Sequence, residues 1–189
     1  MRLENTSLEG LYILHRSIHH DARGYFTRLF GVDEIANAGR PTQALHVNSS
    51  TSLDKGTLRG IHFQYPPHAE TKVVSCISGA VWDVGVDLRP NSPTRFHWFG
   101  TILTPENGTS LIIPEGFGHA FITLEANTTV VYVVSAYYSL QHEAGVRYDD
   151  AKLNINWPIT PNVISKKDIS WGSIESRMSE FDKGFEELN

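Results

Sequence analysis

The chain has 189 residues, and its 16 basic and 21 acidic side chains give a formal net charge of -5 at pH 7. This length suits one domain with a core of its own, and the mildly acidic balance lacks the basic patch of a nucleic-acid-binding protein. No apolar run reaches the length of a membrane span, no apolar signal segment opens the chain, and the single cysteine, Cys76, fits a reducing compartment. We therefore expect a cytoplasmic protein with no membrane or nucleic-acid partner.

Short β-prone runs separated by Gly, Pro, Asn and Asp dominate the chain. They predict strands over 10–18, 44–51, 57–65, 72–79, 80–88, 95–103, 110–116, 119–125 and 128–139. A short helix is predicted over 32–39, and another in the tail of about 170–189, where Ile174, Met178 and Phe181 recur at helical spacing. His19 and His20 are expected in a solvated loop. The pattern favours a single all-β domain over 1–189, a sandwich or barrel with a few short peripheral helices.

Nine histidines in an antiparallel barrel raise the question of a metal site. Such sites need paired histidines and a carboxylate converging on one face. A ligand beside His62 on the same strand face would stand at position 64. That residue is Gln64, a poor ligand for a transition metal, so we expect no bound metal. His68, Glu70 and His119 are the remaining candidate ligands, and His68 and Glu70 are otherwise interpreted as turn residues without a role.

The stretch LRGIHFQYPPHAETK at 58–72 also holds groups suited to acid–base chemistry. His62 and Gln64 share one face of the predicted strand, and a barrel strand turns either this polar pair or its apolar neighbours inward. An inward His62 among apolar side chains is a competent base, and Arg59 and Lys72 together are suited to holding phosphates or an oxyanion. Spacing alone leaves open the alternative of an ordinary core histidine flanked by solvated charges.

The motif PEGFGH at 114–119 is a turn of the kind that cupin barrels carry between two strands. Together with LRGIHFQ, VYVVSAYYS, EAGVRYDD, INWP and ISKKD it closely resembles the dTDP-4-dehydrorhamnose 3,5-epimerase family, from about Asp21 to Asp168. The resemblance implies a cupin-type double-stranded β-helix, or jelly roll, that needs no metal or other cofactor and is usually a homodimer. It also implies epimerisation of dTDP-4-dehydro-6-deoxy-D-glucose at C3 and C5, in dTDP-L-rhamnose biosynthesis.

The resemblance assigns a role to four catalytic positions. By their places in the motifs, His62 matches the base, Asp168 the carboxylate that orients it, Tyr132 the acid on the other face of the sugar, and Lys72 the cation near the keto oxygen. The positions that match substrate or nucleotide contacts are Arg23, Phe26, Arg28, His46, Asn48, Arg59, His119, Tyr138, Glu143 and Lys167. In the family, the segment that corresponds to DARGYF reaches the site of the neighbouring subunit.

Departures from the family pattern leave the nucleotide base open. Arg28 and His46 stand where many members have glutamate and glutamine, and Ala120 and Ala151 replace a usual glycine and proline without removing a chemical group. The alternatives are an enzyme that inverts only C3 or only C5, or one that acts on another nucleotide-linked 4-keto sugar. A third alternative is not an enzyme but a non-catalytic cupin that binds a sugar. The presence of a whole acid–base set disfavours this alternative.

Overall fold

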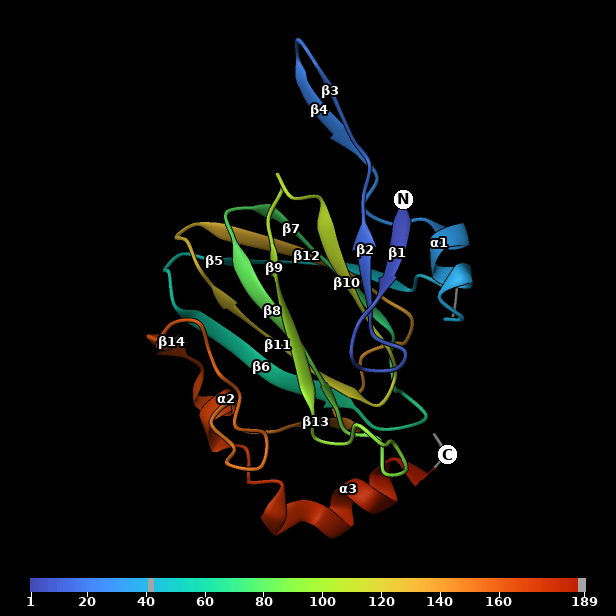
Figure 1. Cartoon of the computed structure of the whole chain (residues 1–189). Helices are drawn as coiled ribbons and strands as arrows, with labels where there is room; N and C mark the ends of the chain where they lie inside the picture. Colours follow the sequence, from blue (N-terminus) through green and yellow to red (C-terminus); the bar gives the residue numbers. More distant parts are fainter. Residues whose placement is uncertain (41–42, 187–189) are drawn as a thin grey trace.

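Two facing β-sheets form the body of the computed structural model, which describes residues 1–40 and 43–186 (Figure 1). One sheet has the order β1 (Arg2–Asn5), β2 (Tyr12–His15), β10 (Thr109–Ile113), β7 (Lys72–Ser78), β12 (Thr128–Val134) and β5 (His46–Ser52). The other has the order β13 (Glu143–Gly145), β6 (Thr57–Gln64), β11 (Phe117–Thr123), β8 (Val81–Asp87) and β9 (Trp98–Leu103), with β14 (Val163–Ile164) parallel to β6. The chain crosses repeatedly between the sheets, so the predicted all-β sandwich is confirmed.

A two-stranded hairpin and short helices lie outside the sandwich. The hairpin pairs β3 (Ile18–Asp21) with β4 (Gly24–Thr27) and projects away from both sheets (Figure 1). The helical segments are α1 (Val32–Asn37), α2 (Lys166–Ser170), the 3-10 turn η1 (Glu175–Arg177) and α3 (Met178–Gly184). Both predicted helices are therefore confirmed. The solvated loop predicted for His19 and His20 is wrong, because these exposed residues belong to β3, where they pair with Phe26 and Tyr25. None of the described helices combines the length and apolar character needed to cross a bilayer.

The outer face of β6 is covered by the C-terminal segment, and this decides which way the strand faces. Ile61 and Phe63 are 0% and 3% exposed and share one apolar cluster with Ile174, Phe181 and Phe185. Burial of these apolar side chains outside the sandwich stabilises the tail against the sheet. Because neighbouring residues of a strand point to opposite faces, the polar pair His62 and Gln64 turns toward the interior. Of the two orientations that the sequence leaves open for this strand, the structure has the one with the polar pair facing inward.

A β-bulge in β6 brings Arg59 and His62 to the same side of the strand. Across the pairing with β11, His119 lies opposite His62 and Phe121 lies opposite Arg59, so three steps on β6 match two steps on β11. The extra residue reverses the normal alternation at this point. Gly60 allows the two strands to approach, because a Cβ at this position would lie 2.4 Å from the Cβ of Ala120. Gly60 also adopts a φ of +120°, which side chains disfavour.

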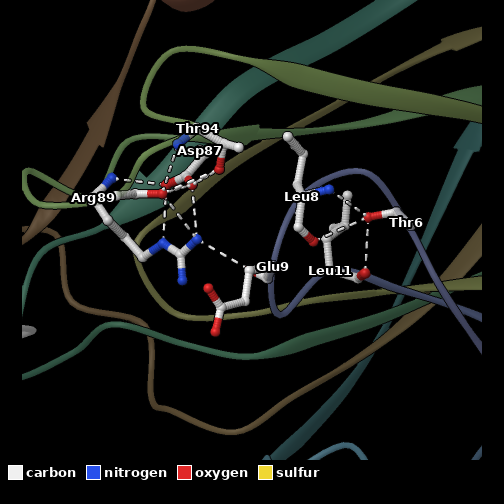
Figure 2. A network of polar contacts seen from close by, with 8 residues as sticks. Thr6, Leu8, Glu9, Leu11, Asp87, Arg89 and Thr94 are labelled. Carbon is white, nitrogen blue, oxygen red and sulfur yellow. Dashed lines mark hydrogen bonds and ion pairs between the residues drawn. The ribbon is translucent and has the colours of Figure 1, made fainter.

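A buried aspartate anchors the segment between β8 and β9 to the turn that joins β1 and β2 (Figure 2). Asp87 is 0% exposed and accepts hydrogen bonds from Arg89 Nε at 2.9 Å and from the hydroxyls of Ser92 and Thr94. Arg89 also donates to the carbonyl of Glu9 at 3.0 Å. Burial alone raises the pKa of Asp87, but the hydrogen bonds outweigh it and hold that pKa below its usual value.

The Asp87→Asn substitution tests how much this anchor stabilises the fold. It leaves Arg89 facing an amide in place of a buried carboxylate, and we expect a loss of about 3 kcal/mol of unfolding free energy in urea at pH 7. Since the folded-state pKa of Asp87 is lowered, its contribution is complete above the usual aspartate pKa and is lost as the pH falls through the lowered value. The difference between the parent and the variant therefore shrinks in acid.

The matched control is Asp149→Asn. Asp149 pairs with Arg147, but both side chains are 41% exposed, so the unfolding midpoint should barely move. Equal midpoints for the Asp87 and Asp149 variants would show that the buried network is not an anchor.

Candidate active site

Two adjoining pockets open between the sheets and share three lining residues, His62, Lys72 and Tyr132. The first pocket has a volume of about 410 Å³ and the second about 300 Å³, a size that suits a small-molecule ligand. The first is also lined by Arg59, His119, Lys167 and Asp168, and the second by His46, Asn48, Glu70, Tyr138 and Glu143. The structure thus gathers most of the predicted site residues in one place, with the three shared residues where the pockets meet.

The three shared residues come from opposite sheets. His62 lies on β6, whereas Lys72 and Tyr132 lie on the neighbouring strands β7 and β12 of the other sheet. Lys72 shares its strand face with Val74, which is fully buried in the interior cluster, and Tyr132 packs against the same cluster. A ligand bound between the sheets is therefore reached by an imidazole from one side and by a phenol and an ammonium from the other.

Asp168 lies beside His62 because the C-terminal part of the chain returns to β6. β14 pairs in parallel with the start of β6, and the next residues form α2, whose first turn is capped by Ser165. The carboxylate of Asp168 lies 2.7 Å from Nε2 of His62 and also accepts from the backbone N–H of Gly60 at 3.2 Å. Burial raises the pKa of Asp168, but the hydrogen bonds from His62, Gly60 and Ser165 outweigh it and lower that pKa overall. The predicted His62–Asp168 pair is thus formed with an ionised carboxylate.

A second histidine–carboxylate pair joins β11, the neighbour of β6, to β8 on its other side. His119 Nε2 is 2.7 Å from Oδ1 of Asp83, and the two side chains are 9% and 0% exposed. Asp83 is a residue that sequence reasoning misses. Its only signal is to be one of two acidic residues in the otherwise apolar strand AVWDVGVDL, and the register that sets it near His119 depends on the pairing of β8 with β11.

In the second pocket, the exposed Tyr138 is held by Glu143, which also pairs with Lys167. Glu143 accepts from the Tyr138 hydroxyl at 2.9 Å and pairs with Lys167 through its other oxygen. Burial raises the pKa of Glu143, but these two partners outweigh it and lower that pKa. Tyr138 is 60% exposed, so its ring offers a face to a ligand rather than to the core.

The cations of the cavity differ in their partners. Lys72 pairs with Glu70 at 3.1 Å and Lys167 pairs with Glu143, whereas within the described part of the chain Arg59 donates to neutral oxygens, the Ser52 hydroxyl and the Thr51 carbonyl. The sequence predicts Glu70 to be a turn residue without a role, so its position beside Lys72 is a second site feature that the sequence does not signal.

The hairpin residues stay outside the cavity of their own chain. Arg23 is paired with Asp21 at 2.6 Å, and its side chain is 89% exposed, while Phe26 is 67% exposed. Arg28 directly follows β4 and is also exposed. His46 lies at the rim of the second pocket, edge-on to Tyr137 with ring centroids 5.2 Å apart.

The alternative metal ligands His68, Glu70 and His119 do not form a ligand set. Each has another neighbour: the ring of His68 lies 4.6 Å from that of His142, Glu70 pairs with Lys72, and His119 with Asp83. Across residues 1–40 and 43–186, no three His, Cys, Asp or Glu side chains converge in a way that could hold an ion.

Comparison with known proteins gives consistent matches along the chain. A family model described as dTDP-4-dehydrorhamnose 3,5-epimerase matches residues 5–176. The dTDP-4-dehydrorhamnose 3,5-epimerase of Sinorhizobium fredii is 39% identical over 175 residues, which cover 92% of this chain and 90% of that protein. A dTDP-4-dehydrorhamnose 3-epimerase of Streptomyces niveus is 38% identical over 169 residues, which cover 89% of this chain and 81% of that protein.

A solved structure extends the likeness to the whole fold. The dTDP-6-deoxy-D-glucose-3,5-epimerase of Legionella pneumophila, in complex with dTDP-4-keto-L-rhamnose, is 35% identical with a TM-score of 0.89, and the match covers 95% of this chain and 96% of that one. With the two facing sheets, this likeness confirms the expected cupin-type jelly roll. The chain therefore belongs to the dTDP-4-dehydrorhamnose 3,5-epimerase family.

Proposed function

We propose that the protein is a dTDP-4-dehydrorhamnose 3,5-epimerase, an isomerase that inverts C3 and C5 of dTDP-4-dehydro-6-deoxy-D-glucose for dTDP-L-rhamnose biosynthesis. The observation that carries the proposal is the cavity in which His62, bonded to Asp168, is joined by Tyr132 and Lys72 from the opposite sheet. Family membership and the dTDP-linked sugar in the Legionella relative support the substrate class. The single buried thiol, Cys76, fits action in the cytoplasm.

The substrate itself supplies the electron sink for this reaction. C3 and C5 both flank the C4 ketone, so removal of a proton from either carbon gives an enolate whose charge lies largely on O4. Inversion then requires that a proton return to the same carbon from the other face. The site needs a base, a proton donor on the opposite side and a positive charge beside O4.

His62 is the proposed base, and its hydrogen bond to Asp168 fixes which nitrogen acts. The ionised carboxylate only accepts hydrogen bonds, so Nε2 carries the proton that is donated to it. Nδ1 is then the nitrogen with a free lone pair, and it takes the proton from carbon. Asp168 also stabilises the imidazolium that results.

Tyr132 and Lys72 complete the reaction from the other sheet. The phenol of Tyr132 is the proposed donor that returns a proton to the carbanion on the face away from His62. The ammonium of Lys72 lies where the cavity's two pockets meet, and there it stabilises the charge that develops on O4. A fixed cation in a buried site is more effective than one in water, because it needs no reorganisation during the reaction.

The nucleotide is held by groups around these three. Arg59 has no carboxylate partner among the described residues, so its guanidinium is free to pair with the diphosphate. Tyr138, fixed by Glu143, offers its exposed ring for stacking on the base. His119 and Lys167 line the first pocket and Asn48 and His46 the second, and we assign them to the sugar nucleotide as well.

We also propose a homodimer in which each hairpin completes the site of the partner. Tyr25 and Phe26 are 52% and 67% exposed on a hairpin that projects from the sandwich (Figure 1). A second subunit over the hairpin would cover these aromatic rings. Arg23 and Arg28 would then reach the nucleotide of the partner.

Inversion of C3 alone is the second candidate. The Streptomyces niveus relative, named as a 3-epimerase, is as similar to this chain as relatives named as 3,5-epimerases. Both reactions use the same base and the same acid, and they differ in whether the sugar also presents C5 to His62.

Deuterium exchange separates the two candidates. In D2O, with dTDP-4-keto-6-deoxyglucose as substrate, the 3,5-epimerase incorporates deuterium from solvent at both C3 and C5, which proton NMR follows as the loss of two signals. Exchange at C3 alone would establish the 3-epimerase, and exchange at neither carbon would overturn the proposed function.

The Asp168→Asn variant tests the His62–Asp168 pair. An amide can donate to Nε2 and so favours the wrong tautomer, and we expect kcat to fall by about 10²- to 10⁴-fold, as in other histidine–carboxylate pairs. The KM for the substrate should change little, because the nucleotide contacts remain. The exposed Asp149→Asn variant is the control. A kcat equal to that of the parent would remove Asp168 from the mechanism.

Mixed dimers test whether the hairpin acts across subunits. Arg23→Ala weakens substrate binding to the partner's site, and Asp168→Asn inactivates its own site. When the two variants are unfolded together and refolded, one site of each mixed dimer pairs an intact cavity with an intact hairpin, so activity should exceed that of either variant alone. Activity that stays at the mean of the two would show that the hairpin does not complete the partner's site.

A further inference from the structure

Glu70 lies inside the candidate active site, beside the residue proposed to stabilise the enolate. Its Oε1 is 3.1 Å from Nζ of Lys72, and the two side chains are only 13% and 11% exposed. We propose that Glu70 is a positioning residue, which holds the Lys72 ammonium where the C4 oxygen of the sugar binds. This inference rests on the proposed function, and it adds to that function a residue whose only effect on the reaction is through Lys72.

The backbone around Glu70 is fixed on both sides, so the carboxylate has a defined place. On one side, Gln64 Nε2 donates to the carbonyl of His68 at 3.0 Å. On the other side, the N–H of Thr71 donates to the Ser135 hydroxyl at 2.8 Å, and Ser135 N–H returns a bond to the Thr71 carbonyl at 3.1 Å. Glu70 is thus held between two anchored residues, close to the first residue of β7.

The other cavity carboxylates are already engaged. Asp168 bonds to His62, and Glu143 bonds to Lys167 and Tyr138. Among the residues that the structure describes, Glu70 is the carboxylate within ion-pair distance of Lys72. The orientation of this ammonium therefore depends on Glu70.

Geometry, and not charge, is what Glu70 supplies. A lysine side chain has four rotatable bonds and loses substantial entropy when it is held in one place. The ion pair with Glu70 limits where the Lys72 ammonium can lie, and it leaves ammonium hydrogens to donate to O4. Its negative charge by itself disfavours an enolate nearby, so an uncharged acceptor at the same place should serve equally well. A group that acted as an acid or base would require the carboxyl itself.

Two substitutions separate these roles. Glu70→Gln keeps an oxygen acceptor for Lys72 and removes the charge, whereas Glu70→Ala removes both. We expect kcat for exchange at C3 and C5 to stay within about 3-fold of the parent in Glu70→Gln and to fall about 10- to 100-fold in Glu70→Ala, the scale of a misplaced catalytic group. KM, and the Kd for dTDP by calorimetry, should change little in either variant, because Glu70 makes none of the proposed nucleotide contacts.

The control removes a comparable pair outside the site. Arg40 and Glu115 lie 3.7 Å apart, and their side chains are 22% and 20% exposed, so Glu115→Ala measures the effect of losing a half-buried ion pair on stability alone. Similar melting temperatures for the two alanine variants, with a kcat loss only in Glu70→Ala, support positioning. A kcat in Glu70→Ala equal to that of an active parent, or a Glu70→Gln as inactive as Glu70→Ala, would overturn this inference and leave the proposed function standing. A parent without exchange would overturn the proposed function instead.

Discussion

Burial of the outer face of β6 beneath the C-terminal segment is the constraint from which the site follows. The rings of Phe63 and Phe181 lie 5.7 Å apart, and this contact holds the tail against the strand. The same tail carries α2, so one packing event turns His62 into the interior and delivers Asp168 to it. Without the tail, the orientation that turns the polar face of β6 inward would leave the apolar side chains of its other face exposed to water.

Pairing of charges explains how so polar an interior is tolerated. Transfer of a carboxylate from water costs several kcal/mol unless its partners compensate it, and the carboxylates that line the cavity, Glu70, Glu143 and Asp168, each have a cationic or imidazole partner. The partners arrive from different strands, so the charges also fix the register of the two sheets around the ligand. Among residues 1–40 and 43–186 no carboxylate pairs with Arg59, which matches the need for a cation toward a diphosphate.

Local patterns in the sequence predict much of the scaffold and only part of the site. Alternation marks the strand over 57–65, but the choice of its inner face depends on a tail more than a hundred residues away. Asp168 is identifiable only through family resemblance, because the pairing of β14 with β6 leaves no local signal. Glu70 is an acidic residue in a turn, and Asp83 is one of two in an otherwise apolar strand, and nothing in their neighbours indicates a partner. The hairpin is missed since its exposed residues show no apolar alternation.

The central claim is that His62 removes the proton from one sheet and Tyr132 returns it from the other. The most direct test compares hydrogen exchange with inversion in D2O for the Tyr132→Phe and His62→Ala proteins. The Tyr132→Phe protein should still exchange hydrogen for deuterium beside the ketone, because His62 on β6 can remove and return a proton on one face, but it should invert the carbon far more slowly. The His62→Ala protein should do neither. A Tyr132→Phe protein that inverts as fast as the parent, or a His62→Ala protein that exchanges as fast, would contradict this mechanism.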